Sequence, residues 1–368
     1  MAATVLIGGS RMAGQELHPD LNIISIERYD QYNNLFQYHE SEWIGSDVVC
    51  SIPLSSNRVL WLFGDTLLGK VKNKKRVGSG PYINNSIAIQ IIGENDESEI
   101  TFYWNKQGDK NEAFFTRQEG IPGDYYWPTA GVLLDEVLVI FCYAIDIDKD
   151  IGFEIVGSVM IIISNYNEEP TKWEAVYHYF TNWDHHRSFQ TALYIEHPYI
   201  YFMGYDDLDS KRRAVLARTT GEKLIDLKSS KALEYLVLSD GEKVWRQKPD
   251  DLVPLFSPGN TETDIHYISD KKLYVCTTYN PYTDEVFLVT TEHITGPWSK
   301  SKSVYKIPEH GGELPCTSYA VRVQSHLSTQ PGQLVISYAT NAKDDLFGLF
   351  SEKGLEIYWP RFILINYD

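Results

Sequence analysis

Short apolar segments alternate with polar turns along most of the chain, and they recur in the same order five times. In each copy an apolar strand is followed by a turn and by a second apolar strand with a polar end, as in "SDVVCSIPL" and "NRVLWLFGDT". Segments of this length that are rich in Val, Ile, Tyr and Phe are typical of β-strands. The five second strands read "RVLWLFGDT", "EVLVIFCYAID", "YIYFMGYDD", "KLYVCTTYN" and "QLVISYATN". We therefore predict five similar β-hairpins.

Most of these hairpins are followed by a third strand and often by a fourth, such as "INNSIAIQII" and "ITFYW" in the first unit. Four-stranded units repeated around an axis make a β-propeller. A long β-sandwich also has many short strands, but it gives no reason for five similar hairpins. We predict an all-β, five-bladed β-propeller with four-stranded antiparallel blades, as one domain over residues 1–368. The blades are expected at residues 43–105, 126–180, 188–245, 262–307 and 318–366.

The outer strand of the fifth unit has two candidates that lie far apart in the sequence. "YWPRFILI" lies near residue 360 and "NIISIERY" near residue 25, and the pattern leaves both open. No run with helix caps and a sustained 3.6-residue period stands out, and no Pro- or Gly-rich linker divides the chain. One domain without a prominent helix is therefore expected.

The charge and the cysteine content restrict the classes of partner and ligand that we expect. The 33 basic and 50 acidic residues give a net charge of −17, which would repel a nucleic-acid backbone and an anionic membrane surface. The four cysteines lie far apart without metal-ligand spacing, so buried free thiols are expected, with no metal and no cofactor. The first 17 residues do not read as an export signal, and no run approaches the roughly 20 apolar residues of a membrane span. We expect a soluble cytoplasmic protein, or a secreted one if a leader has been removed, of undetermined oligomeric state.

Two aspartates stand at the polar ends of the first hairpin. If the turn lies at "SSN", its centre near Ser56 is midway between Asp47 and Asp65, so the two side chains face each other across the strands. Opposed positions have Cβ atoms about 4.5–5.5 Å apart, and like charges there destabilise a sheet. Paired carboxylates in a cleft separate their pKa values into an acid and a base or nucleophile, which is the chemistry of glycoside hydrolysis. Each aspartate alone could instead order a turn through local hydrogen bonds.

A family resemblance rests on the order of several motifs. "WIGSD", "LWLFGDTLLG", "KKRVGSG", "INNSIAIQ" and "YYWPTAGVLL", with later motifs such as "TGPWSKSKSVYKIPE", resemble an uncharacterised-domain family of bacterial five-bladed propellers. Its characterised relatives include endo-acting D-arabinofuranases, and the likeness covers about residues 36–363. The resemblance implies a glycosidase in which Asp47 and Asp65 are the catalytic candidates. Ser46 stands where that pattern leads us to expect a second glycine.

Further candidates lie near the same mouth of the predicted axis. Glu262 precedes the inner strand of the fourth unit and is a candidate general acid or a solvated loop acid. Arg322, within an inner strand, is expected to neutralise a buried carboxylate, which could be catalytic. Aromatic faces and side-chain amides could bind a sugar, although core packing and turn chemistry are their commoner roles. The predicted substrate-binding residues are Trp43, Asn84, Asn85, Trp127, Tyr279, Tyr319, Arg322 and His326.

Three functional hypotheses follow. The first is a glycoside hydrolase of arabinofuranosidase or arabinanase type, which acts on a furanoside-containing glycan through the paired carboxylates. The second is a cytosolic propeller enzyme that cyclises or isomerises a small natural-product substrate. The third is a non-catalytic carbohydrate-binding propeller. All three expect a carbohydrate or another small molecule as the partner.

Overall fold

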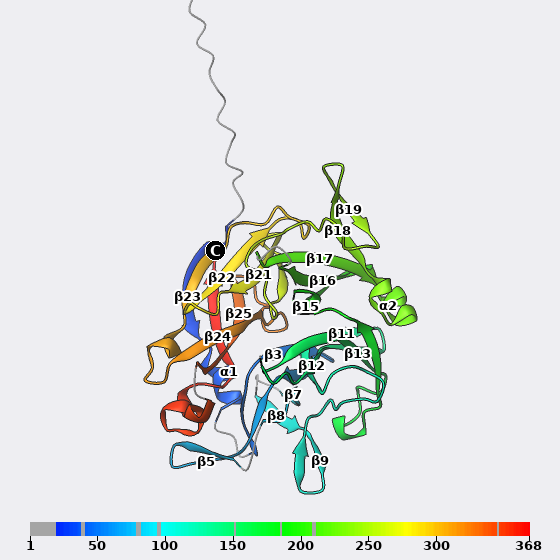
Figure 1. The fold of residues 1–368 in the computed structure, drawn as a ribbon. Helices are drawn as coiled ribbons and strands as arrows, with labels where there is room; N and C mark the ends of the chain where they lie inside the picture. Colours follow the sequence, from blue (N-terminus) through cyan, green and yellow to red (C-terminus); the bar gives the residue numbers. More distant parts are fainter. Residues whose placement is uncertain are drawn as a thin grey trace, which may run out of the picture.

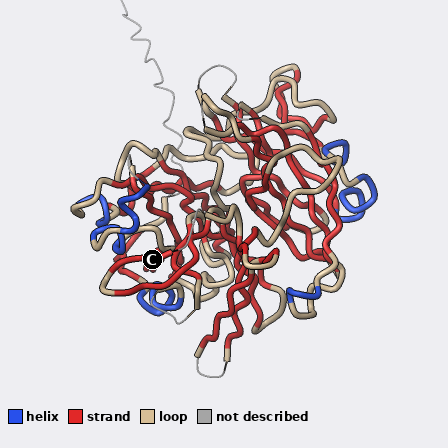
Figure 2. The backbone as a smooth tube through the Cα atoms, turned by 60° about the horizontal axis from the view of Figure 1, so that its bottom comes forward, coloured by secondary structure: helices blue, strands red, loops and turns tan. Residues whose placement is uncertain are grey.

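The computed structural model describes residues 20–37, 41–78, 82–93, 97–150, 152–184, 186–207, 211–343 and 346–368. Over these residues the protein is an all-β molecule with two short α-helices, α1 (Asp30–Leu35) and α2 (Gly221–Leu227). Short 3₁₀ turns lie at Pro170–Lys172, Ser230–Ala232, Pro308–Gly311, Leu346–Phe350 and Lys353–Glu356. Figure 2 shows strands throughout the body and the helical segments at its edges. No helix in the described part is long and apolar enough to cross a membrane.

Five larger antiparallel sheets follow one another along the described chain (Figure 1). The first two contain β3 (Val49–Pro53), β4 (Arg58–Phe63), β7 (Ser86–Ile92) and β8 (Ser98–Tyr103), then β11 (Tyr125–Leu134), β12 (Val137–Asp146), β13 (Glu154–Ile163) and β14 (Ala175–Thr181). The third contains β15 (Arg187–Glu196), β16 (Tyr199–Asp206), β17 (Arg213–Thr220), β18 (Glu234–Ser239) and β19 (Glu242–Arg246). The last two contain β20 (Ile265–Ile268), β21 (Leu273–Tyr279), β22 (Glu285–Thr291) and β23 (Lys302–Lys306), then β24 (Cys316–Val323), β25 (Gln333–Ala342), β26 (Arg361–Tyr367) and β1 (Ile23–Arg28).

The predicted strands map onto these sheets, with three differences. The third sheet has a fifth strand, β19, which pairs with β18. Both candidates for the outer part of the last sheet are used, because β26 is its third strand and β1 its fourth. Two smaller sheets, β2 (Trp43–Ser46) with β5 (Thr66–Lys72) and β6 (Lys75–Gly78), and β9 (Asn105–Gln107) with β10 (Lys110–Glu112), lie outside the repeat.

The core lies between consecutive sheets. Alternate side chains of a strand point to opposite faces, so Leu60 and Leu62 of β4 pack toward the second sheet while Trp61 and Phe63 pack toward the fifth. Equivalent apolar clusters join the second sheet to the third, the third to the fourth and the fourth to the fifth. Because both faces of the central strands are buried, their sequences read as continuous apolar runs. All four cysteines are free and buried, which confirms the prediction for them.

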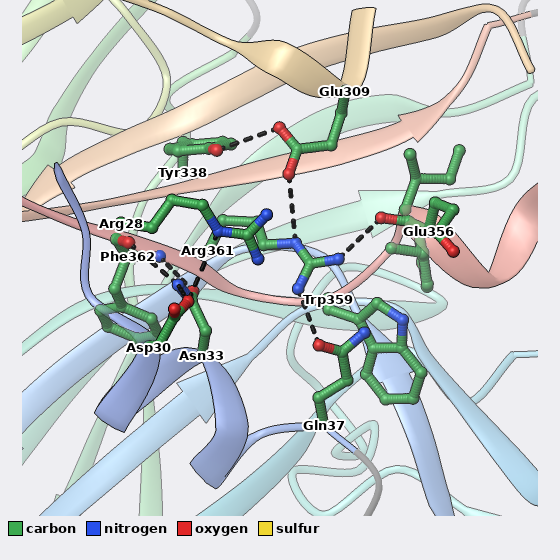
Figure 3. Close-up of polar contacts among 12 residues, drawn as sticks. Arg28, Asp30, Asn33, Gln37, Glu309, Tyr338, Glu356, Trp359, Arg361 and Phe362 are labelled. Carbon is green, nitrogen blue, oxygen red and sulfur yellow. Dashed lines mark hydrogen bonds and ion pairs between the residues drawn. The ribbon is translucent and has the colours of Figure 1, made fainter. Parts of the chain in front are cut away.

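Hydrogen bonds and an ion pair connect the fifth sheet to the segment that follows β1. The Arg361 guanidinium, at the start of β26, forms a buried ion pair with Glu309 at 3.4 Å and donates to Gln37 Oε1 at 2.9 Å. Asn33 of α1 binds the backbone N–H and carbonyl of Phe362 (Figure 3). The early residues are therefore held against the last strand by side chains as well as by the β1–β26 ladder.

The first strands of the five sheets meet at the centre. Strand β11 contacts β3 and β15, β15 contacts β20, and β24 contacts both β3 and β21. Arg322 of β24 donates to the carbonyls of Thr129 at 2.6 Å, Thr263 at 2.7 Å and Thr191 at 3.2 Å. Its side chain therefore connects the fifth sheet to the second and third sheets and to the segment that precedes the fourth.

Candidate active site

The first hairpin places Asp47 opposite Asp65. The β3–β4 register runs from Val49 opposite Phe63 to Pro53 opposite Val59, and two further residues toward the open end bring the aspartates together. The Asp47 N–H donates to the Asp65 carbonyl at 3.2 Å. The cross-strand arrangement expected from the sequence is therefore present.

Local backbone conformation fixes this end of the hairpin. Val48 has a φ of 46°, in the left-handed region, which interrupts the strand between Asp47 and β3. A Cβ at Gly64 would lie 2.5 Å from Asp47 Oδ1, so a larger residue there would displace this carboxylate. The Ser46 hydroxyl lies 2.9 Å from the carbonyls of both Asp47 and Asp65. This serine therefore links the backbones of the two aspartates.

Each of three carboxylates accepts a hydrogen bond from an aromatic side chain. Tyr319 OH donates to Asp47 Oδ2 at 2.9 Å, and Trp127 Nε1 donates to Asp65 Oδ1 at 2.8 Å. Tyr279 OH donates to Glu262 Oε2 at 2.6 Å. The donors come from the fifth, second and fourth sheets. The arrangement thus draws its parts from strands far apart in the sequence.

Burial raises the pKa values of both aspartates, and neighbouring charges raise that of Asp47 further. Burial is the main reason that the pKa of Asp47 lies well above its ordinary value, and the charges of Asp65 and Glu262 raise it further. Burial also raises the pKa of Asp65 to about 6, against the opposing effect of hydrogen bonds from Trp127 and Asn84. A donor to the ionised form stabilises that form. When the pair shares one proton, these effects therefore favour the proton on Asp47 and the charge on Asp65.

These carboxylates line a pocket of about 850 Å³, a volume typical of small-molecule sites. The pocket lies at the ends of strands, between the first, second, fourth and fifth sheets. Tyr282 at its edge is 93% exposed, and Phe153 packs edge-on against Trp127 with ring centroids 4.8 Å apart. The aromatic residues of the lining are Trp127, Tyr143, Phe153, Tyr279, Tyr282 and Tyr319.

The structure separates the predicted binding residues into two groups. Trp127, Tyr279 and Tyr319 line the pocket, and Asn84 lies beside it, with its amide 3.5 Å from Asp65 Oδ1. Trp43 is 1% exposed and stacks on Phe102 within the core. Its indole N–H donates to Ser86, so its polar atom is already satisfied.

Asn85, Arg322 and His326 also lie outside the pocket. Asn85 is fully buried and binds the backbone of Phe115 and Tyr126, which joins the first sheet to the second. Arg322 binds backbone carbonyls rather than the catalytic candidates, and the buried carboxylate whose pKa it lowers is that of Asp264. Arg322 and His326 line a different cavity. The expectation that Arg322 partners a catalytic carboxylate therefore has no support in these contacts.

Sequence reasoning missed several lining residues. Tyr143 lies near the end of a second strand, where the same rule that gave Tyr279 would have found it. Phe153, Arg212 and Tyr282 lie in or beside loops, and Arg212 is paired with Asp207 at 3.0 Å. No periodic signal in the sequence identifies these three residues, because loops carry no strand pattern.

Comparison with known proteins places the chain in a family. The family model described as a domain of unknown function, DUF5005, matches residues 29–367. The chain belongs to the DUF5005 family. This confirms the resemblance to an uncharacterised-domain family, while the relation to D-arabinofuranases stays a prediction. No curated protein matches the chain.

Solved structures resemble the DUF5005 chain in fold. A crystal structure of a candidate hydrolase from Bacteroides ovatus matches with a TM-score of 0.72 at 18% identity, over 96% of each chain. At this identity the likeness shows a shared fold. The catalytic domain of a GH62 α-L-arabinofuranosidase from Coprinopsis cinerea matches with a TM-score of 0.45 at 8% identity, over 90% of this chain and 93% of that one. A GH43_1 enzyme from Xanthomonas citri gives 0.44 at 10% identity, over 87% of each chain.

Proposed function

We propose that this protein is a glycoside hydrolase acting on a furanoside-containing glycan, built on a five-bladed propeller whose blades are the five larger sheets. The observation that carries the proposal is the pocket in which Asp47, Asp65 and Glu262 each accept a hydrogen bond from an aromatic side chain. The succession of core clusters from sheet to sheet, with the last shared by the fifth and first sheets, supports the blade assignment.

The two aspartates have different roles in this mechanism. Asp47 is the acid, because burial and the neighbouring charges raise its pKa and favour its protonated form, and it gives its proton to the leaving glycosidic oxygen. Asp65 is ionised above about pH 6, and its carboxylate either attacks the anomeric carbon or takes a proton from the attacking water. In either case water adds across the C–O bond. The leaving oxygen receives the proton of Asp47, and the attacking water gives a proton back to one of the two carboxylates.

Glu262 faces this pair from the segment before the fourth sheet. Its Oε2 atom accepts from both Tyr279 and Thr261, at 2.6 and 2.7 Å, so its orientation is fixed. Its charge contributes to the raised pKa of Asp47. We assign it the role of keeping Asp47 protonated and of binding sugar hydroxyls.

The aromatic lining suits a carbohydrate. Trp127 and Tyr282 offer ring faces for the C–H surface of a sugar, while the polar groups of the pocket offer partners for its hydroxyls. The furanoside class comes from the motif resemblance, with Asp47 and Asp65 at the positions of its catalytic candidates.

The test is a reducing-end assay on a panel of D-arabinan, L-arabinan and xylan, run in parallel with wild type and Asp65→Asn. Release of reducing ends from an arabinan by wild type, lost in the variant, supports the proposal. Binding of the same glycans by calorimetry without any release would instead favour a non-catalytic carbohydrate-binding protein. Equal release by both proteins would remove Asp65 from the chemistry.

A further inference from the structure

A further cavity adjoins the first pocket on the side of Asp65. Asn84, Tyr125 and the β9–β10 hairpin line it, and we call it the hairpin cavity. Its volume is about 930 Å³, against about 850 Å³ for the first pocket. The Asn84 amide lies 3.5 Å from Asp65 Oδ1, and Asp65 lines the first pocket. The hairpin cavity therefore begins within hydrogen-bond distance of a proposed catalytic carboxylate.

Strand β11 contributes an aromatic side chain to each of the two cavities. Tyr125 and Trp127 are alternate residues, so their side chains point to the same face of the strand. Tyr125 lines the hairpin cavity and Trp127 the first pocket, and their rings meet edge-on with centroids 5.4 Å apart. Phe153 contacts Trp127 in turn. A row of three aromatic rings therefore runs from the first pocket into the hairpin cavity.

The β9–β10 hairpin has no part in the core. It lies outside the five larger sheets and projects from the body of the molecule (Figure 1). None of the apolar clusters of the described residues includes a side chain from residues 105–112. Side-chain hydrogen bonds nevertheless hold it, because Trp104 donates to Asn111 Oδ1 at 3.1 Å and Asn105 donates to two backbone carbonyls at 2.8 and 3.0 Å. A hairpin that is fixed in place without adding to the core is suited to binding.

The lining of the hairpin cavity combines charges of both signs with aromatic rings. Its carboxylates are Asp109, Glu112 and Asp124, its cations are Lys110 and Arg117, and its tyrosines are Tyr82 and Tyr125. Arg117 and Asp124 pair at 3.5 Å, so their charges offset each other. Carboxylates accept hydrogen bonds and cationic side chains donate them, whereas a sugar hydroxyl does both. The mixed lining therefore suits a neutral glycan better than a ligand with charges of one sign.

We propose that the hairpin cavity binds further sugar residues of the same glycan chain whose linkage is cleaved in the first pocket. The chain passes from one cavity to the other beside Asp65 and Asn84, along the row of aromatic rings. The identity of the ligand rests on the proposed function. The inference adds a dependence on chain length, because sugar residues beyond the cleaved linkage gain contacts that a short substrate lacks.

The test measures binding by calorimetry in Asp65→Asn, in which binding is separated from turnover. Disaccharides and hexasaccharides of D-arabinan, L-arabinan and xylan are titrated separately. For at least one of these glycans, the hexasaccharide should bind about tenfold more tightly than the disaccharide. This ratio of the two dissociation constants is the chain-length advantage.

Variants in the same background locate the advantage. Ala113→Trp places a large side chain in the hairpin cavity and should remove most of it. Val176→Trp adds the same side chain at a position that is 54% exposed and outside both cavities, and it should keep the advantage. Lys110→Ala removes an exposed side chain of β10, so it should fold normally and reduce the advantage about threefold. Thermal melting shows whether each variant is folded.

The same oligosaccharides are also given to the wild type, so that a failure of the inference is distinguished from a failure of the proposed hydrolysis. An advantage that is lost in Ala113→Trp, without release of reducing ends by wild type, would contradict hydrolysis but support the role of the hairpin cavity. Equal binding of short and long chains, or an advantage that persists in both Ala113→Trp and Lys110→Ala, would overturn the inference while hydrolysis by wild type still stands. If no glycan binds, both are overturned.

Discussion

The two ends of the central strands hold half-buried carboxylates in different surroundings. At one end Asp47, Asp65 and Glu262 line a single pocket, and each accepts a hydrogen bond from a neutral aromatic donor. At the other end Asp264 lies alone beside the Arg322 guanidinium. Neutral donors orient a carboxylate without removing its charge, whereas a cation offsets it. The carboxylates of the first end therefore keep their ionisable character beside neutral partners, whereas at the second end the Arg322 charge offsets that of Asp264.

The largest expected effect comes from neutralising Asp47 and Asp65, the proposed catalytic pair. Asp47→Asn and Asp65→Asn keep the shape and the hydrogen-bond acceptor but remove the ionisable group, so each should lower turnover by about 10³-fold. Both folded pKa values are raised, so ionisation lowers the stability of the fold as pH rises through them. The variants should therefore be more stable than wild type at pH 7.5. Activity and urea unfolding are measured together.

A matched control is available at the end of a second strand. Asp146 of β12 is exposed and lies outside the pocket, so Asp146→Asn should leave both turnover and stability at the wild-type level. If both pocket variants lose stability but keep their activity, Asp47 and Asp65 are structural residues. The two ends of the central strands would then not differ in catalytic chemistry.

Arg322 should give the next largest effect, on stability. Arg322→Met removes the donor to three buried carbonyls that belong to three sheets, at a cost of about 3 kcal/mol or more. Arg246→Met changes an exposed arginine of β19 and should cost less than about 0.5 kcal/mol. Denaturant unfolding gives the free energy of unfolding of both variants. Equal values would mean that the Arg322 guanidinium does not hold the sheets together.

Trp127 should have a moderate effect that appears in the pH profile. Trp127→Phe keeps an aromatic face but removes the N–H that stabilises ionised Asp65, so the pKa of Asp65 should rise above about 6. Turnover at pH 6 should fall about tenfold and partly recover at higher pH, since a hydrogen bond to a charged group is worth about 1.5–3 kcal/mol. An unchanged acidic limb of kcat/KM against pH would assign that limb to another group.

The smallest expected effect is a pH-dependent gain of stability when Asp264, at the other end of the central strands, is replaced by asparagine. Burial raises the pKa of Asp264 to about 7, above the value of about 3.9 for an unfolded chain. Its ionisation therefore lowers the stability of the fold as pH rises from about 4 to about 7. Asp264→Asn should become progressively more stable relative to wild type across this interval. A difference in unfolding free energy that stays constant from pH 4.5 to 7.5 would contradict the titration of this carboxyl.

The sequence predicted the strands and one feature of the site well, for a physical reason. Strands buried on both faces give long apolar runs, and a hairpin register follows from its turn, so Asp47 opposite Asp65 could be read from spacing alone. The same burial on both faces made the residues that line the pocket harder to predict. When both faces of a strand are apolar, spacing does not show which aromatic side chain reaches a pocket, so Trp43 and Trp127 looked equivalent although Trp43 lies in the core.

Contacts between sheets were beyond the sequence pattern. Arg322 and Asn85 donate to backbone carbonyls of segments far away in the sequence, and the packing of the folded chain decides such partners. Phe153 and Tyr282 reach the pocket from outside the regular strands, where periodicity gives no information. The paired strands could thus be predicted, and the lining supplied by loops could not.

The pairing of β1 with β26 has a consequence for how the molecule assembles. Residues 23–28 have their partner in residues 361–367, so the fifth sheet cannot be completed until almost the whole described chain has been synthesised. Until then Trp61 and Phe63 of the first sheet lack the apolar partners that β25 and β26 provide. Closing so long a loop is a slow step in folding, and it follows all local hairpins. On the ribosome, the first sheet emerges early but remains exposed to aggregation until the last strand arrives.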